Sequence, residues 1–204
     1  MDICDLDNNG RNEIIIIACH LYYFPTQLVI LDEKGKILGE YWNSGHFNDY
    51  VFVDLNNDGR KEIILGGINN EYRKPCIVVF DSTIVKGSSP QSGYYKCNEF
   101  ERGSEKYYIL LPRTDVDLLE ALLAGINRVD ILKNRRLSFE TRYSNIYFEF
   151  NYNFELQNID FSNYFIQKHK LLVLEGKVKT KLNEKYKEKL AQNILYYDGN
   201  GWPL

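Results

Sequence analysis

Histidine is scarce in this chain, and the sequence motifs of common catalytic sites are missing. Only three histidines occur among the 204 residues, and His20, His46 and His169 stand singly rather than as an H-E-x-x-H pair. The chain also contains no G-x-S-x-G, P-loop or G-x-G-x-x-G motif. We therefore expect a protein that is not an enzyme.

The four cysteines form no C-x-x-C pair, so a zinc site is not expected. Cys4, Cys19 and Cys76 lie in apolar segments, which favours buried free thiols. A disulfide between Cys76 and Cys97 is the alternative.

Long apolar runs and an excess of positive charge are missing as well. No stretch approaches the roughly 18 to 20 apolar residues of a membrane span, and the N-terminus lacks the basic and apolar regions of a signal peptide. Lys and Arg number 25 against 28 Asp and Glu, for a formal net charge of −3. These features predict no membrane contact by this segment and no nucleic-acid partner.

What the chain does contain is a duplication. Residues 5–14 and 54–63 are near copies separated by 54 − 5 = 49 positions, and the same offset places residues 28–32 on 77–81. Apolar, partly β-branched segments follow both copies and predict strands. A repeat of roughly 40 to 50 residues with several short strands is typical of a β-propeller blade.

The duplicated loops carry oxygen side chains at positions 1, 3, 5 and 9 around a glycine at position 6. This spacing lets a tight loop surround a hard cation such as Ca²⁺. An EF-hand is excluded, because its glutamate at position 12 would fall on Ile16 and Leu65. The same residue types also build metal-free turns through Asx hydrogen bonds, so both interpretations stay open.

Residues 1 to about 85 resemble the FG-GAP or VCBS-type repeats, the calcium-loop blades of integrin α-chain propellers and of many bacterial surface and sensor proteins. In that family the side chains at positions 1, 3, 5 and 9 and the carbonyl at position 7 bind Ca²⁺. The resemblance implies a first set of ligands: Asp5, Asp7, Asn9, Glu13 and the Arg11 carbonyl. It implies a second set: Asp54, Asn56, Asp58, Glu62 and the Arg60 carbonyl. Three carboxylates remain in each set, so we expect weakened rather than lost Ca²⁺ binding.

In the first repeat we predict strands at 14–19, 27–32, 36–42 and 49–54, joined into one blade with a hairpin turn at 32–35. Residues 86–93 are rich in turn formers and predict a loop. Residues 103–111 echo 59–67, which suggests a degenerate third blade.

The C-terminal half predicts further strands at 128–132, 137–142, 146–152 and 154–161. A short helix or helical turn is predicted at 115–124, and a pair of helices at 162–175 and 180–192. A last strand is predicted at 194–197.

The expected fold class is mainly β: a partial or open β-propeller with two calcium-loop blades, a degenerate β region and a small C-terminal helical pair. Residues 1–94 hold the blades, and residues 95–204 pack with them as one unit. Only residues 2–5 are left for the first blade's leading strand. We therefore expect missing N-terminal sequence in a larger protein, and an open first-blade edge.

The resemblance implies a non-enzymatic, calcium-stabilised binding or sensing module of a larger bacterial protein. Its expected location is extracytoplasmic, either periplasmic or at the cell surface. The expected partner is an unidentified protein or glycan. A carbohydrate-active or lectin-like propeller domain and a structural spacer are the alternatives.

Overall fold

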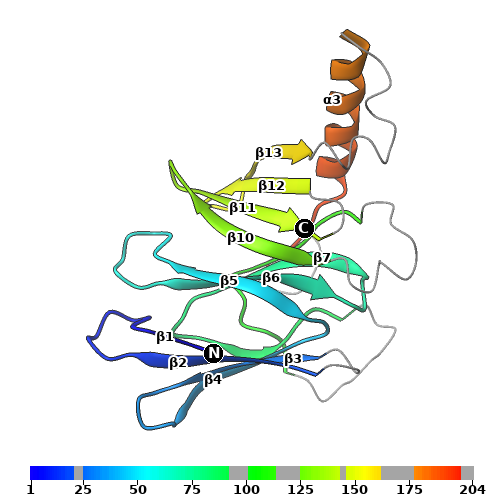
Figure 1. Ribbon diagram of the computed structural model, residues 1–204. Helices are drawn as coiled ribbons and strands as arrows, with labels where there is room; N and C mark the ends of the chain where they lie inside the picture. The colour runs from blue at the N-terminus through cyan, green and yellow to red at the C-terminus, as the bar shows by residue number, and fades with distance from the viewer. Residues whose placement is uncertain (21–24, 92–100, 114–124, 143–145, 162–176, 199–204) are drawn as a thin grey trace.

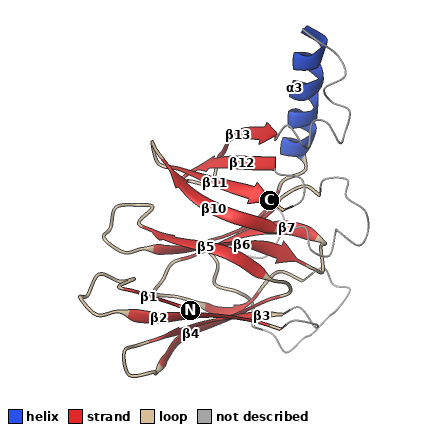
Figure 2. Cartoon of the chain, in the orientation of Figure 1, coloured by secondary structure: helices blue, strands red, loops and turns tan. Residues whose placement is uncertain are grey.

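A computed structural model describes residues 1–20, 25–91, 101–113, 125–142, 146–161 and 177–198. Strands predominate in this part of the chain (Figure 2), and they form three separate sheets stacked one above another (Figure 1). The prediction of a mainly β protein is confirmed.

The first sheet contains the N-terminal repeat. From one edge to the other, its strands are β1 (Asp2–Cys4), β2 (Glu13–Cys19), β3 (Thr26–Leu31), β4 (Ile37–Asn43) and β8 (Lys86–Ser88). The first four strands are antiparallel neighbours, and β8 lies parallel to β4. The predicted hairpin turn is confirmed: Gly35 has a φ of 81°, and its N–H donates to the Asp32 carbonyl at 3.0 Å.

The second sheet lies in the middle of the stack and is wholly antiparallel. From one edge to the other, its strands are β14 (Leu195–Asp198), β9 (Tyr107–Leu110), β7 (Lys74–Phe80), β6 (Glu62–Asn69) and β5 (Phe47–Val53). Every residue of β6 is buried, because sheets cover both of its faces. The sheet also unites the chain, since strands from both predicted segments, 1–94 and 95–204, belong to it.

The third sheet is an antiparallel meander. Its strands, in order, are β10 (Ile126–Leu132), β11 (Arg136–Thr141), β12 (Ile146–Asn151) and β13 (Leu156–Phe161). Buried and partly exposed residues alternate along β12, as the period-2 pattern predicted.

Two apolar clusters fill the spaces between the sheets. One contains Ile63 and Leu65 of β6 and packs against the first sheet; the other contains Ile64 and packs against the third. Successive side chains of a strand point to opposite faces, so an unbroken apolar run serves both clusters. The helix α3 (Lys177–Gln192) adds Leu190 to the second of these clusters.

Residues 47–53 form a strand, but its predicted place in the first blade is wrong. Strand β5 pairs with β6 in the second sheet. By the 49-residue offset, β1 corresponds to the end of β5. In the first and second sheets alike, an edge strand therefore leads into the duplicated loop. The Asn43 side chain stabilises the connection from β4 in the first sheet to β5 in the second, because its amide donates to the carbonyls of Gly45 and Ile68.

Two further predictions about strand placement are wrong. Residues 107–110 form β9, which pairs with β7 in the second sheet and is not part of a third blade equivalent to β6. The third sheet is built instead from residues 126–161. Within the predicted loop 86–93, Lys86–Ser88 is a strand, because Gly87 lies opposite Tyr41 and extends the first sheet.

Only the second helix of the predicted pair lies among the described residues. Helix α3 begins at Lys177, three residues before Thr180, and ends at Gln192 as predicted. Residues 162–175 and 115–124 lie outside the described residues. The last strand is β14, which pairs with β9 and not with the first sheet. Across the part of the chain that the structure describes, the three sheets do not close into a ring.

Replacing Phe148 tests the packing of the second and third sheets. Phe148 is fully buried in β12 opposite Phe139. We expect Phe148→Ala to lower the free energy of unfolding by about 3 to 5 kcal/mol, because it leaves a cavity. The control is Asn158→Ala at an exposed position of β13, expected to change it by less than about 0.5 kcal/mol. Urea denaturation followed by circular dichroism measures both, and equal losses would contradict the assigned core.

Candidate functional site

The two duplicated loops occupy equivalent places in neighbouring sheets. One joins β1 to β2, the other joins β5 to β6, and both project from the same side of the stack (Figure 1). Their backbones agree: Asn8 and Asn57 have φ angles of 60° and 62°, and Gly10 and Gly59 have 82° and 89°. Asn and Gly are the residues that accept this left-handed conformation most readily, which explains their places in the repeat.

The first aspartate of each loop holds the turn together. The Asp5 carboxylate accepts the N–H groups of Asn9 at 3.1 Å and Gly10 at 2.9 Å. In the second loop, Asp54 accepts those of Asn57 at 2.6 Å and Gly59 at 2.9 Å. Such bonds are those of the metal-free turn, so each loop has a defined shape of its own.

The glutamate at position 9 closes each loop from the strand side. Glu13 and Glu62 are the first residues of β2 and β6, and both are buried. Glu13 accepts the Leu6 N–H at 2.8 Å, and Glu62 accepts the Leu55 N–H at 2.9 Å. Each bond engages one carboxylate oxygen and points the carboxylate into the loop.

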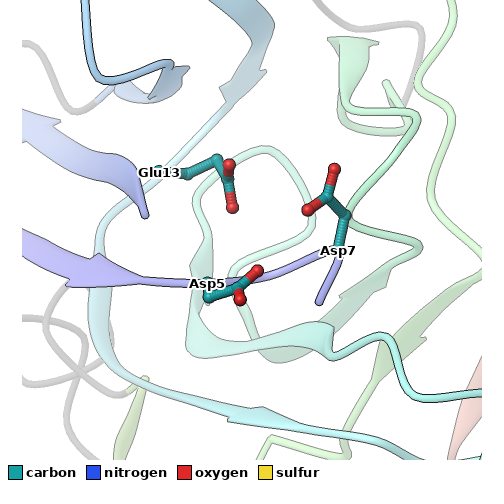
Figure 3. A group of neighbouring side chains, drawn as sticks. All are labelled: Asp5, Asp7 and Glu13. Atoms are coloured by element: carbon teal, nitrogen blue, oxygen red, sulfur yellow. The ribbon is translucent and has the colours of Figure 1, made fainter. Parts of the chain in front are cut away.

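In the first loop, three carboxylates converge. Oxygen atoms of Asp5, Asp7 and Glu13 all lie within 4.8 Å of one another, and Figure 3 shows the three side chains around a common space. Carboxylate oxygens are the donors that Ca²⁺ prefers, and like charges this close repel one another when no cation is present. Asn9 is engaged in the turn, because its Oδ1 accepts the Arg11 N–H at 2.8 Å and its Nδ2 donates to Asp7.

The second loop does not gather its carboxylates in the same way. Among the described residues, the group formed by Asp5, Asp7 and Glu13 has no counterpart there. Asp58 instead accepts the Arg60 N–H at 2.8 Å and the Asn56 amide at 2.9 Å. The hydrogen bond from the Arg60 N–H, and to a smaller extent that from Asn56, holds the pKa of Asp58 below its ordinary value. The loops thus share a backbone but differ in their side chains.

Cations from distant segments of the chain contact the second loop. Lys106, which precedes β9, places Nζ 3.1 Å from Glu62 Oε1. Arg135, in the turn between β10 and β11, donates to Asn57 Oδ1 at 2.8 Å and to the Leu55 carbonyl. Sequence reasoning missed both residues, because they lie far from the loop along the chain.

Buried polar side chains form hydrogen bonds between the first and second sheets. The Tyr41 hydroxyl donates to Glu105 Oε1 at 2.9 Å, and the Tyr108 hydroxyl donates to Asn43 Oδ1 at 2.9 Å. Glu105 is 6% exposed, and burial raises its pKa despite the hydrogen bond from Tyr41. Nothing in the local sequence distinguishes Glu105 from an exposed acid, so this network was not predicted.

An aromatic pocket of about 470 Å³ lies where the second sheet meets the turn between β12 and β13. Its lining comes from three separate segments and includes Tyr107, Phe154 and Tyr196, together with the polar residues Asn153 and Glu155. The pairing of β9 with β14 brings these segments together, which no local pattern in the sequence indicates.

The three described cysteines, Cys4, Cys19 and Cys76, are free thiols with different environments. Cys76 is fully buried, and burial raises its pKa to about 12. Cys4 is partly buried, whereas Cys19 is exposed, contrary to the expectation of burial. Cys97 lies outside the described residues. Of the histidines, His46 contacts the His20 carbonyl at 3.1 Å through its ring nitrogen, and His169 lies outside the described part.

Comparison with known proteins found no matching family model, no matching curated protein and no matching solved structure. Within the described ranges, the structure holds no helix with the length and apolar character needed to cross a bilayer.

Glu105→Gln tests the buried carboxyl. Because the folded state raises the pKa of Glu105, its favourable contribution is present below the unfolded pKa and is lost as pH rises through the folded one. The Gln oxygen still accepts the Tyr41 hydrogen bond without this loss. We expect the variant to lose less stability than the wild type between about pH 4 and pH 7.

The control is Glu184→Gln, at an exposed position of α3. Urea midpoints across the pH range measure both variants. If the pH dependence of Glu105→Gln equals that of the wild type, the assigned burial of this carboxyl is wrong.

Proposed function

We propose that this chain is a non-enzymatic binding or sensing module stabilised by Ca²⁺, with the first loop as its metal site. The observation that carries the proposal is the convergence of Asp5, Asp7 and Glu13 within 4.8 Å. The carboxylates come from a turn and a strand end held by backbone hydrogen bonds, so the oxygens are arranged before any ion arrives.

The residues present in the first loop fit a calcium ion. Asp5, Asp7 and Glu13 would supply carboxylate oxygens, with the Asn9 amide oxygen and the Arg11 carbonyl as further donors. The ion would neutralise three adjacent negative charges and so stabilise the junction of β1 with β2. Asp54, Asn56, Asp58 and Glu62, with the Arg60 carbonyl, form the second set that the resemblance implies.

The resemblance to FG-GAP or VCBS-type repeats supports the remainder of the proposal. Stacked sheets with a loop between the first two strands agree with calcium-loop blades. We expect dissociation constants of about 10⁻⁵ to 10⁻³ M, the range of oxygen-ligand sensor and extracellular sites. Such affinities suit an extracytoplasmic segment of a larger bacterial protein that binds an unidentified protein or glycan.

A second candidate function is lectin-like glycan binding, and the aromatic pocket favours it. Tyr107 and Tyr196 offer flat apolar surface for a sugar ring, and Asn153 and Glu155 offer hydrogen-bonding groups beside them. Saturation-transfer NMR with neutral oligosaccharides tests this function. Loss of the signal in Tyr196→Ala supports it, and no transfer from the wild-type protein to any sugar would contradict this role of the pocket.

Calcium should stabilise the folded chain. Free Ca²⁺ at 100 times its dissociation constant adds about 2.7 kcal/mol per independent site that the unfolded chain lacks. Thermal melts in EDTA and in millimolar Ca²⁺ measure the shift, and Mg²⁺ at the same ionic strength is the control. An unchanged melting temperature would reduce the first loop to a metal-free turn.

Asp7→Asn should weaken calcium binding without breaking the turn. The substitution removes one of three converging charges and the oxygen that accepts the Asn9 side-chain amide, but it keeps an oxygen that accepts the Asn9 N–H, now 3.2 Å from Asp7. We expect at least a tenfold rise in the dissociation constant measured by isothermal titration calorimetry.

The matched control is Asp58→Asn, which removes a charge from the second loop and should leave this dissociation constant unchanged. Stronger loss in the control would assign the main site to the second loop.

A further inference from the structure

The ion pair between Lys106 and Glu62 distinguishes the second loop from the first. Lys106 Nζ lies 3.1 Å from Glu62 Oε1, and the side chains of Lys106 and Glu62 are 39% and 6% exposed. The other oxygen of Glu62 accepts the Leu55 N–H. The position-9 glutamate of the second loop therefore has both oxygens engaged, one of them by a full positive charge.

Within the described residues, the first loop has an apolar residue, not a lysine, at the place equivalent to Lys106. Leu31 and Phe80 correspond, because 80 − 31 = 49. In the first sheet Leu31 pairs with Ile37. In the second sheet Val79, the residue before Phe80, pairs with Tyr107, and Lys106 directly precedes Tyr107. An apolar side chain thus stands where the second sheet has a lysine.

The contacts of Glu13 agree with this difference. None of the ion pairs between described residues includes Glu13. The carboxylates of the first loop converge on one another, whereas those of the second loop do not.

Strand topology explains how the lysine reaches the loop. The fourth strand of the first sheet, β4, follows β3 after a tight turn. In the second sheet the corresponding strand is β9, which begins at Tyr107. It follows β8, which pairs with β4 in the first sheet. Lys106 directly precedes β9, and its side chain reaches across β7 to Glu62, the first residue of β6.

We infer that the Lys106 ammonium is the built-in cation of the second loop, so that this loop keeps its fold without Ca²⁺ and only the first loop binds the ion. Calcium binding at the second loop would require breaking a partly buried ion pair and placing an ammonium beside a divalent cation. Arg135, which donates to Asn57 and to the Leu55 carbonyl, adds a second positive charge there. The expected single equivalent rests on the proposed function of the first loop, whereas the role of Lys106 does not.

Removing the charge of Lys106 should open the second loop to calcium. Lys106→Met keeps an unbranched apolar stem and deletes the ammonium. We expect one equivalent of Ca²⁺ for the wild type and two for the variant by equilibrium dialysis with radioactive calcium. In the double variant Asp7→Asn/Lys106→Met, the second loop should be the stronger calcium site. Adding Asp54→Asn to this variant should remove that site.

Lys86→Met is the matched control, because Lys86 forms an exposed ion pair with Glu101 at 2.9 Å and not with a residue of either loop. It should keep one equivalent. In EDTA, Lys106→Met should melt at a lower temperature than Lys86→Met, and Ca²⁺ should restore more of that loss than it adds to the control. Lys106→Gln repeats the test if the methionine variant does not fold.

The possible outcomes separate the two proposals. Two equivalents in the wild type, or no additional equivalent in Lys106→Met and Lys106→Gln, would overturn the role of Lys106. No calcium in the wild type but one equivalent in the variants would support that role and contradict the proposed metal site of the first loop. If no form of the protein bound calcium, both proposals would be wrong.

Discussion

The burial of the second sheet on both faces is the constraint on which the rest of the structure depends. Strand β6 sends Ile63 and Leu65 toward the first sheet and Ile64 toward the third, so one strand anchors both apolar clusters. Since this sheet also receives β9 and β14 from later in the chain, the N-terminal and C-terminal halves share one core. The sheet is therefore the element that holds the stack together.

This constraint also positions the loops. Each loop ends at the first residue of a strand that enters the core, and the buried glutamates at those residues, Glu13 and Glu62, hold the loops by backbone hydrogen bonds. A carboxylate buried at such a place must be matched by a hydrogen-bond donor and by positive charge. The second loop has Lys106 as that charge, and the proposed match in the first loop is Ca²⁺.

Much of the local structure could be predicted because it depends on neighbouring residues. The alternation of Ile146 to Tyr152 predicted β12, and the Asn and Gly residues of the duplicated loops predicted the turns that the structure shows. Strand pairing was harder. Residues 49–54 were correctly predicted as a strand but placed in the wrong sheet, and residues 103–111 were assigned to a third blade although β9 belongs to the second sheet. An apolar pattern shows that a strand is buried and not which neighbour buries it.

By itself, the sequence determined the existence of most of the strands, the turn of each repeated loop and the candidate ligand residues, because spacing and backbone preference act within a few residues. Only the tertiary structure decided which carboxylates converge. Asp5, Asp7 and Glu13 meet within 4.8 Å, whereas Glu62 meets Lys106, 44 residues further along the chain. Two loops with nearly the same sequence differ because electrostatic balance depends on the charges that folding brings beside them, and those come from distant strands.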